Sequence, residues 1–171
     1  MVFWLTGLSA SGKTTLANFL SDHLRGKGFA VEQLDGDTLR AKFPNTGFTK
    51  EDRIQHVRRA GDLAVQSEKN GAIVIASLIS PYREARSYVR SCCSHFVEVY
   101  VKASLETCEA RDPKKLYKKA RSGEIKNFTG IDDPYEEPEN PEIVITTDDQ
   151  TVEQSFDTLK KFAETVMSHI H

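Results

Sequence analysis

Eight residues near the start of the chain have the types and spacing of a loop that binds phosphate groups. The sequence GLSASGKT, from Gly7 to Thr14, fits the pattern G-x-x-x-x-G-K-[ST]. Glycines let such a loop curl so that backbone N–H groups point at phosphate oxygens, and a following helix directs its positive end to the same place. Lys13 can then reach the β- and γ-phosphates, and the Thr14 hydroxyl can ligate Mg²⁺. A chance match in a chain this long has a probability of roughly 0.6%, so the sequence predicts a Mg-ATP site.

Two carboxylates follow the next apolar stretch, in the sequence Asp35-Gly36-Asp37. Two acids beside a bound polyphosphate would repel it unless a metal ion were present. With Mg²⁺ they can hold metal-bound water or accept a proton from an attacking hydroxyl. The alternative interpretation is an Asp-Gly turn with a helix N-cap at Asp37. The chain has no NKxD-type guanine-reading motif, which argues against a GTPase.

Basic residues gather in two further places, and each group has a plain interpretation as well as a functional one. The first group comprises Arg40, Arg53, Arg58, Arg59, Arg83 and Arg86, and the second is the run Lys114, Lys115, Lys118, Lys119 and Arg121. Each arginine of the first group is either a solvated helix residue or, as part of the group near the phosphate loop, a clamp that holds an anionic acceptor through two hydrogen bonds. The lysine-rich run is either a solvated helix face or a segment that closes over a triphosphate.

Short apolar runs alternate with longer helical periods along the chain, which is the pattern of an α/β fold. We predict strands at 2–6, 30–34, 73–76, 96–101 and 143–146, and helices at 13–27, 50–70, 82–90, 104–111 and 151–170. Thr49 to Asp52 and Thr151 to Gln154 fit capping boxes. A polar segment from about 113 to 140 is predicted to be a mobile lid. These elements predict a three-layer P-loop NTPase fold, a parallel five-stranded sheet with helices on both faces, which binds ligands at the carboxyl edge.

Composition limits the class of protein. A chain of 171 residues with 39% apolar and 28% charged residues corresponds to one globular domain, residues 1–171. A net charge of -2 gives no reason to expect binding to nucleic acid or to an anionic membrane. Three cysteines, two of them adjacent, imply no disulfide framework, so we expect a reducing, cytoplasmic location.

Five segments together resemble the adenylyl-sulfate kinase family over nearly the whole chain, from Phe3 to about Ile145. They are WLTGLSASGKTT, LDGDTLR, GFTKEDRIQHVRRAGDLA, ASLISPYREAR and CEARDPKKLYKKARSGEIKNFTGIDDPYEEP. The resemblance implies transfer of the ATP γ-phosphate to the ribose 3′-hydroxyl of adenylyl sulfate, which gives ADP and 3′-phosphoadenylyl sulfate. It also implies a homodimer and allows a fused or associated ATP sulfurylase, from which this domain would have been cut.

The resemblance assigns roles to residues at three sites. Those at the ATP site are Gly7, Leu8, Ser9, Ala10, Ser11, Gly12, Lys13, Thr14, Thr15 and Arg111, the last beside the adenine. Those at the acceptor site are Asp37, Arg40, Phe48, Arg53, His56, Ile79, Ser80, Lys118, Phe128 and Thr129. Phe48 and Phe128 would sandwich the acceptor adenine. Thr14, and Asp37 through water, would hold Mg²⁺, while Lys13 and Asp37, supported by Asp35, would act in catalysis.

The sequence departs from the family pattern at three positions. Ala10 and Lys115 stand where glycine is frequent, and His56 stands where an asparagine that contacts the acceptor is common. Ser80 matches a serine assigned as a phosphorylated intermediate in some members, although in-line transfer between two bound nucleotides needs no covalent step. Two alternatives remain: another small-molecule P-loop kinase, and a nucleotide-dependent switch or inactive domain.

Overall fold

Five short strands form a single parallel sheet in the computed structural model, which describes residues 1–169. They are β1 (Val2–Thr6), β2 (Val31–Asp35), β3 (Ile73–Ser77), β4 (Phe96–Lys102) and β5 (Ile143–Thr146). Their order across the sheet is β2-β3-β1-β4-β5, and every neighbouring pair is parallel. β1 and β3 are buried throughout, because helices cover both faces. All five carboxyl ends therefore meet at one edge, as the sequence predicts.

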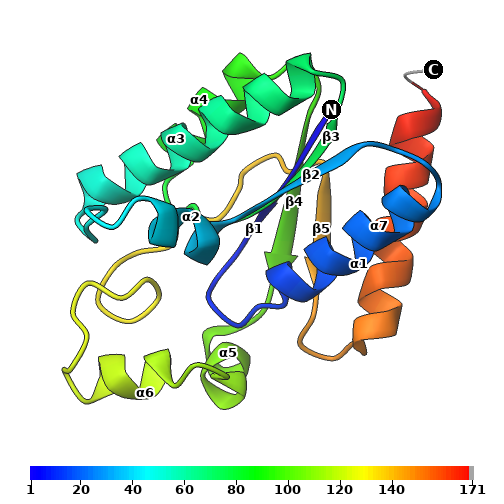
Figure 1. The fold of residues 1–171 in the computed structure, drawn as a ribbon. Helices are drawn as coiled ribbons and strands as arrows, with labels where there is room; N and C mark the ends of the chain where they lie inside the picture. The colour runs from blue at the N-terminus through cyan, green and yellow to red at the C-terminus, as the bar shows by residue number, and fades with distance from the viewer. Residues whose placement is uncertain (170–171) are drawn as a thin grey trace.

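Seven helices connect and flank the strands in the described chain (Figure 1). They are α1 (Lys13–Gly26), α2 (Gly36–Lys42), α3 (Lys50–Lys69), α4 (Arg83–Cys92), α5 (Leu105–Arg111), α6 (Leu116–Arg121) and α7 (Val152–Ser168). α1 and α7 pack on one face, where Leu16, Leu20 and Leu159 meet buried side chains of the sheet. α3 and α4 cover the other face around Trp4 and Val57. The expected three layers are confirmed.

Local sequence signals set several helix ends. Thr49 and Asp52 form a reciprocal capping box at the start of α3, and Thr151 and Gln154 form another at the start of α7. Each box satisfies two backbone N–H groups that have no partner within the helix. Both predicted boxes are confirmed. The predicted end of the last helix at Ile170 lies outside the described residues.

Other parts of the fold differ from the predictions. The short helix α2 was not predicted, and its N-cap is Asp35 rather than Asp37. Phe19, which was predicted to lie on the buried face of α1, is 41% exposed and packs edge-on against the ring of Phe156. Val65, predicted on the inner face of α3, is only half-buried. Periodicity alone does not distinguish the centre of a helix face from its margin.

The segment predicted to be a lid has two unlike parts. Its first part contains α6, which lies with α5 below the carboxyl edge of the sheet in Figure 1. Its second part is fastened to the body of the protein: Arg86 donates to the carbonyl oxygen of Glu136 at 2.6 Å, and the Tyr135 hydroxyl lies 2.8 Å from Thr6 Oγ1. The lid prediction therefore applies best to the first part, and its mobility stays a prediction. No helix among the described residues is long and apolar enough to cross a membrane.

Candidate active site

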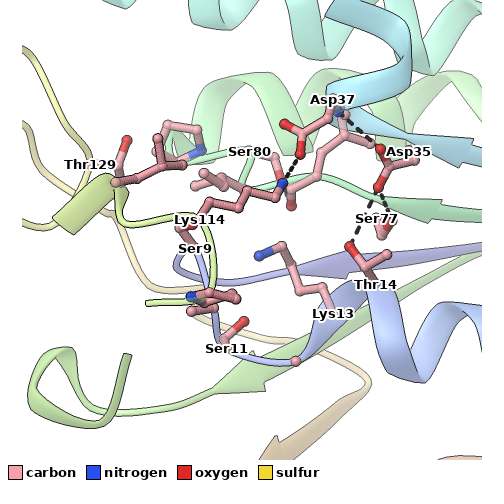
Figure 2. A pocket seen from close by; sticks show the side chains of 18 of the residues that line it. Ser9, Ser11, Lys13, Thr14, Asp35, Asp37, Ser77, Ser80, Lys114 and Thr129 are labelled. Carbon is pink, nitrogen blue, oxygen red and sulfur yellow. Dashed lines mark hydrogen bonds and ion pairs between the residues drawn. The ribbon is translucent and has the colours of Figure 1, made fainter. Parts of the chain in front are cut away.

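One large cavity, of about 1450 Å³, opens at the carboxyl edge of the sheet. Its walls come from the phosphate loop, the start of α2, the start of α3, the loop after β3 and the lid segment. A pocket for a single drug-sized ligand usually has about 300–1,000 Å³. The cavity therefore has room for more than one ligand, and Figure 2 shows polar side chains entering it from several elements.

Backbone geometry in the phosphate loop explains both of its fixed glycines. A Cβ atom at Gly7 would collide with the carbonyl oxygen of Val101, so the loop can pass the end of β4 only without a side chain. Gly12 is the N-cap of α1 and has a φ of 106°, which glycine adopts easily. Ala10 also has a positive φ, of 64°. Alanine thus occupies a left-handed position, which explains why glycine is frequent there in the family that the sequence resembles.

Lys13 lies at the first turn of α1 and is 8% exposed. Its ammonium donates to the carbonyl oxygen of Leu8 at 2.7 Å, which folds the side chain back over the loop. Burial lowers the pKa of Lys13 to about 8, and the charges of Asp35 and Asp37 oppose that fall. The Lys13 ammonium is therefore a buried positive charge beside the phosphate loop. It forms no ion pair within residues 1–169, and an isolated buried charge is unfavourable.

Asp35 joins three elements at the point where β2 ends. Its Oδ1 accepts from the backbone N–H groups of Asp37 and Thr38 at 3.1 Å each, which caps α2. Its Oδ2 accepts from the hydroxyls of Thr14 at 3.4 Å and Ser77 at 3.3 Å. The carboxylate is thus held between the phosphate loop and the end of β3 (Figure 2). The prediction placed Asp37 at the metal with Asp35 in support, whereas Asp35 is the carboxylate beside Thr14.

Asp37 faces the lid instead. Its carboxylate pairs with the ammonium of Lys114, which reaches it from the segment before α6 (Figure 2). Both side chains are well exposed, at 70% and 61%. The pair therefore bridges the two sides of the cavity opening, and an exposed ion pair of this kind contributes little to folding stability.

The residues at the ATP end hold the phosphate loop from behind. Arg111 donates to the carbonyl oxygen and the hydroxyl of Thr147 at 2.5 and 3.0 Å, and to the carbonyl oxygen of Ala10 at 3.3 Å. The Thr147 hydroxyl donates to the carbonyl oxygen of Ser11 at 2.8 Å. From α6, the Tyr117 hydroxyl donates to the carbonyl oxygen of Ser9 at 2.8 Å. These three contacts fix the loop through its carbonyl oxygens and use none of its N–H groups.

Aromatic and basic side chains line the other end of the cavity. The ring of Phe48 is 57% exposed, and the guanidinium groups of Arg40 and Arg53 lie 4.5 and 5.7 Å from its centroid. Arg53 also donates to the carbonyl oxygens of Phe48 at 3.1 Å and Asn127 at 2.5 Å. Phe128 is buried and packs edge-on against Tyr117. Both predicted adenine-binding rings therefore line one cavity, but the stacking itself stays a prediction.

Two buried polar atoms in this region have no hydrogen-bond partner within residues 1–169. They are Nδ1 of His56, a residue 5% exposed, and Oγ1 of Thr129, a residue 2% exposed. Burial, then the charges of Arg40 and Arg59, lower the pKa of His56 to about 4, so the ring is neutral at pH 7. Buried polar groups normally have a partner, so both atoms fit a ligand that donates or accepts hydrogen bonds here.

Ser80 has a buried hydroxyl that belongs to an internal network. Its Oγ accepts from Trp4 Nε1 at 3.1 Å and lies 2.9 Å from Thr6 Oγ1. Its carbonyl oxygen accepts from Arg86 at 2.5 Å, and its φ of 42° is left-handed. Arg86 in turn pairs with buried Glu98 at 2.9 Å. These contacts fit a residue that positions the loop after β3, including Ile79, better than they fit a nucleophile.

The structure thus brings most of the predicted site residues to one cavity, but not all of them. Lys118 is exposed on α6 and does not line the cavity, and neither do Gly7 and Leu8, which form the rear of the loop. Sequence reasoning did not single out Lys114, and it missed Ser77 and Thr147. The last two are polar residues at or just after the ends of β3 and β5, a position that is a usable signal in a parallel sheet.

Comparisons with known proteins agree with this geometry. Residues 1–146 match the family described as Adenylylsulphate kinase. An adenylyl-sulfate kinase of Rippkaea orientalis is 54% identical over 156 residues, which are 91% of this chain and 86% of that protein. A probable adenylyl-sulfate kinase of Aeropyrum pernix is 48% identical over 98% of this chain and 94% of its own length.

A solved structure extends the agreement to three dimensions. The Mycobacterium tuberculosis APS kinase CysC, in complex with AMPPNP and APS, superposes with a TM-score of 0.91 at 38% identity, covering 95% of this chain and 96% of that one. The family match, the relatives and the solved structure all name adenylyl-sulfate kinase, the family that the sequence motifs resemble. The chain belongs to the adenylylsulphate kinase family and is an ATP-dependent phosphotransferase.

Proposed function

We propose that the enzyme binds ATP on the phosphate loop and adenylyl sulfate between Phe48 and Phe128, and transfers the γ-phosphate to the ribose 3′-hydroxyl. The observation that carries this proposal is the single cavity that joins the phosphate loop to the ring- and arginine-lined end. Two nucleotides can lie end to end in it, so that a hydroxyl of one meets the terminal phosphate of the other. The Mycobacterium tuberculosis relative was solved with AMPPNP and APS, which supports the same pair of ligands here.

In this proposal the loop amides and Lys13 hold the β- and γ-phosphates. Arg111 positions the loop through Ala10 and Thr147 and borders the adenine. Arg40 and Arg53 present positive charge to the phosphosulfate group, while Phe48 and Phe128 contact the acceptor adenine through their faces. His56 Nδ1 and Thr129 Oγ1 gain the partners that they lack in the described chain. Lys118 does not line the cavity, so we give it no contact with the acceptor.

Mg²⁺ fits the oxygen donors at the end of β2. The Thr14 hydroxyl and the Asp35 carboxylate lie side by side, and hydroxyl, carboxylate and phosphate oxygens are ligands that Mg²⁺ prefers. We assign the metal-binding role to Thr14, with Asp35 rather than Asp37 holding metal-bound water. When bound, the ion would supply positive charge that neutralises the phosphate groups of ATP. Asp37, which has no metal role in this proposal, would orient the 3′-hydroxyl and accept its proton on leaving its ion pair with Lys114.

Transfer is direct in this mechanism. The 3′-oxygen attacks the γ-phosphorus in line, the bond to the β-phosphate oxygen breaks, and the electron pair leaves with ADP. A covalent route through Ser80 would need to extract its hydroxyl from between Trp4 and Thr6. We therefore give Ser80 a positioning role in the acceptor loop.

A coupled ADP-release assay with Mg-ATP, with and without adenylyl sulfate, tests the proposal. ADP release that depends on adenylyl sulfate, with 3′-phosphoadenylyl sulfate as the product, is expected. ADP release with other acceptors only would favour another small-molecule kinase. ATP binding without turnover on any acceptor would favour a switch or inactive domain.

The remaining proposals concern the oligomeric state of the enzyme, a fused partner and its location in the cell. A homodimer rests on the family resemblance alone. The two relatives are matched over most of their own lengths, so they lend no support to a fused ATP sulfurylase. Cys92, Cys93 and Cys108 are all free thiols, which fits the proposed reducing cytoplasm.

A further inference from the structure

Arg86 is a charged residue that is buried behind the wall of the cavity. It lies near the start of α4, is 3% exposed and does not line the cavity. Its guanidinium donates to a carboxylate oxygen of Glu98 at 2.9 Å, to the carbonyl oxygen of Ser80 at 2.5 Å and to the carbonyl oxygen of Glu136 at 2.6 Å. One side chain thus connects β4, the loop after β3 and the second part of the lid segment.

The ion pair with Glu98 does not by itself account for an arginine at this position. A buried ion pair removes two charges from water, and apolar residues of similar volume often stabilise a fold as well or better. Arginine differs from apolar residues and from lysine in its planar group of five donors with a fixed geometry. That geometry lets Arg86 hold the carbonyl oxygens of two segments that are far apart in the sequence. The contacts therefore indicate that Arg86 holds backbone in place.

The loop at residues 78–81 is the part of the cavity wall that Arg86 holds. Ser80 has a φ of 42°, and a residue other than glycine keeps such a conformation only where the surrounding contacts enforce it. Arg86 supplies one contact at the carbonyl oxygen of Ser80. The Thr6 hydroxyl supplies another, because it donates to the carbonyl oxygen of Ile79 at 2.7 Å. Two consecutive carbonyl oxygens of the loop are thus held by side chains behind the cavity wall.

This loop belongs to the acceptor end of the cavity. It follows β3, which lies between β2 and β1, whereas Arg111 and Thr147, which hold the phosphate loop, follow β4 and β5 on the other side of the sheet. Leu78 belongs to the same apolar cluster as Val57 of α3, the helix that also carries Arg53. A displacement of the loop therefore moves the wall that faces the acceptor, while the phosphate loop keeps its own supports.

We propose that Arg86 is a positioning residue for the acceptor: it holds the Ser80 carbonyl oxygen, and so fixes residues 78–81 in the conformation that binds adenylyl sulfate, without touching either substrate. This inference rests on the proposed phosphotransfer. A wall that is already ordered spends no binding energy on ordering when the acceptor arrives. It also keeps the 3′-hydroxyl at the distance from the γ-phosphorus that in-line attack requires.

Steady-state kinetics of Arg86→Lys test the inference. Lysine keeps a positive charge beside Glu98, so the carboxylate does not lose its partner, but a single nitrogen cannot reproduce the fork that holds both carbonyl oxygens. The kcat/KM for adenylyl sulfate should fall by about 100-fold, as for a misplacement of about 1 Å. The Kd for a non-hydrolysable ATP analogue should change by less than about threefold, because the phosphate loop and Arg86 share no contact.

Arg90→Met is the matched control for loss of stability. Arg90 lies one turn further along α4 and pairs with the other oxygen of Glu98 and with Glu142. It does not line the cavity, and its guanidinium lies over the ring of Phe96, away from the loop after β3. Arg90→Met should lower the Tm but leave the kcat/KM for adenylyl sulfate within about threefold of wild type. Each variant is assayed below its own Tm, which circular dichroism gives.

Trp4 reports on the same loop through its fluorescence. It is the only tryptophan in the chain, it is fully buried, and its indole Nε1 donates to Ser80 Oγ at 3.1 Å. If Arg86 holds Ser80, the emission maximum of Trp4 should shift in folded Arg86→Lys, because the environment of the indole N–H changes with the loop.

Three results would overturn the inference. They are a near-normal kcat/KM for adenylyl sulfate in Arg86→Lys, an equal weakening of the ATP analogue, and an equal loss of kcat/KM in Arg90→Met. Wild-type enzyme that releases no ADP with adenylyl sulfate would overturn the proposed function and the inference with it. The two failures are therefore distinguishable, because only the second appears in the wild-type enzyme.

Discussion

Lys13 should reduce the stability of the empty enzyme, although it is needed for activity. Its ammonium is 8% exposed and, within the described chain, donates one hydrogen bond to Leu8 but has no ion-pair partner. Replacing Lys13 with methionine removes the buried charge and keeps most of the side-chain volume. We therefore expect Lys13→Met to make the unliganded protein more stable while it abolishes most of the activity.

The lowered pKa sets the size of the stability effect. The fall from 10.5 to about 8 corresponds to about 3 kcal/mol, at about 1.4 kcal/mol per pKa unit. Loss of the hydrogen bond to Leu8 costs about 1 kcal/mol. The net gain at pH 7 is thus about 2 kcal/mol, or a rise in Tm of about 4–8 °C for a protein of this size.

The sign of the pH dependence follows from the same shift. Between about pH 8 and 10.5 the unfolded chain binds a proton at Lys13 that the folded chain has released. The wild-type protein therefore gains stability across this window relative to Lys13→Met, and the full destabilisation applies below pH 8. The difference between the two proteins should shrink as the pH rises.

Urea unfolding of wild type and Lys13→Met, at pH 7 and at several pH values up to 10, measures the stability difference and its change with pH. Lys69→Met, at an exposed lysine of α3, is the control. Wild type should gain stability from ATP by mass action, while Lys13→Met should gain little. A variant no more stable than wild type at pH 7, or a difference that does not change with pH, would refute the reasoning. Turnover should fall at least 100-fold, as for other positioned electrostatic contacts.

Three further predictions follow from other contacts. Asp37→Asn should lose far more turnover than ATP affinity, because Asp37 faces the lid and not the loop; equal losses in kcat and in ATP binding by calorimetry would contradict a role in proton transfer. Ala10→Gly should stabilise the protein by about 1 kcal/mol by relieving the left-handed φ of 64°, measured by urea unfolding, and a loss of stability would count against the strain. Arg86→Met should cost about 3 kcal/mol, because it leaves the buried carboxylate of Glu98 with the half-exposed Arg90 as its remaining cation; a cost below about 1 kcal/mol by the same assay would show that Arg90 suffices.

Sequence reasoning recovered the features that depend on neighbouring residues. The phosphate loop is a local backbone structure, and its glycines, Lys13 and Thr14 lie together because they are consecutive. Capping boxes at Thr49 and Thr151 also depend on residues three apart. The parallel sheet follows from alternating strands and helices together with the handedness of crossovers. Such features need no knowledge of distant contacts.

Contacts between residues far apart in the sequence could not be predicted from local patterns. Asp35 and Asp37 are two residues apart, yet one side chain joins Thr14 and Ser77 while the other meets the lid at Lys114. α2 starts at the intervening glycine and directs the two carboxylates in different directions. No periodicity in the sequence signals that turn. The division of roles between the two acids therefore became visible only in three dimensions.

The two ends of the first part of the lid have unusual backbone conformations, and one of them touches the acceptor side of the cavity. Lys115 and Asn127 bound this part, and each has a φ of 57°, a left-handed conformation that costs roughly 1–3 kcal/mol in a residue other than glycine. On both sides of Asn127 the chain is attached to the body, through Tyr117 to the phosphate loop and through Tyr135 and Glu136 to the end of the sheet. Arg53, from the acceptor side, holds the carbonyl oxygen of Asn127 at 2.5 Å. An acceptor anion that drew Arg53 toward itself would therefore pull on Asn127, at the end of the lid segment that faces the acceptor side of the cavity.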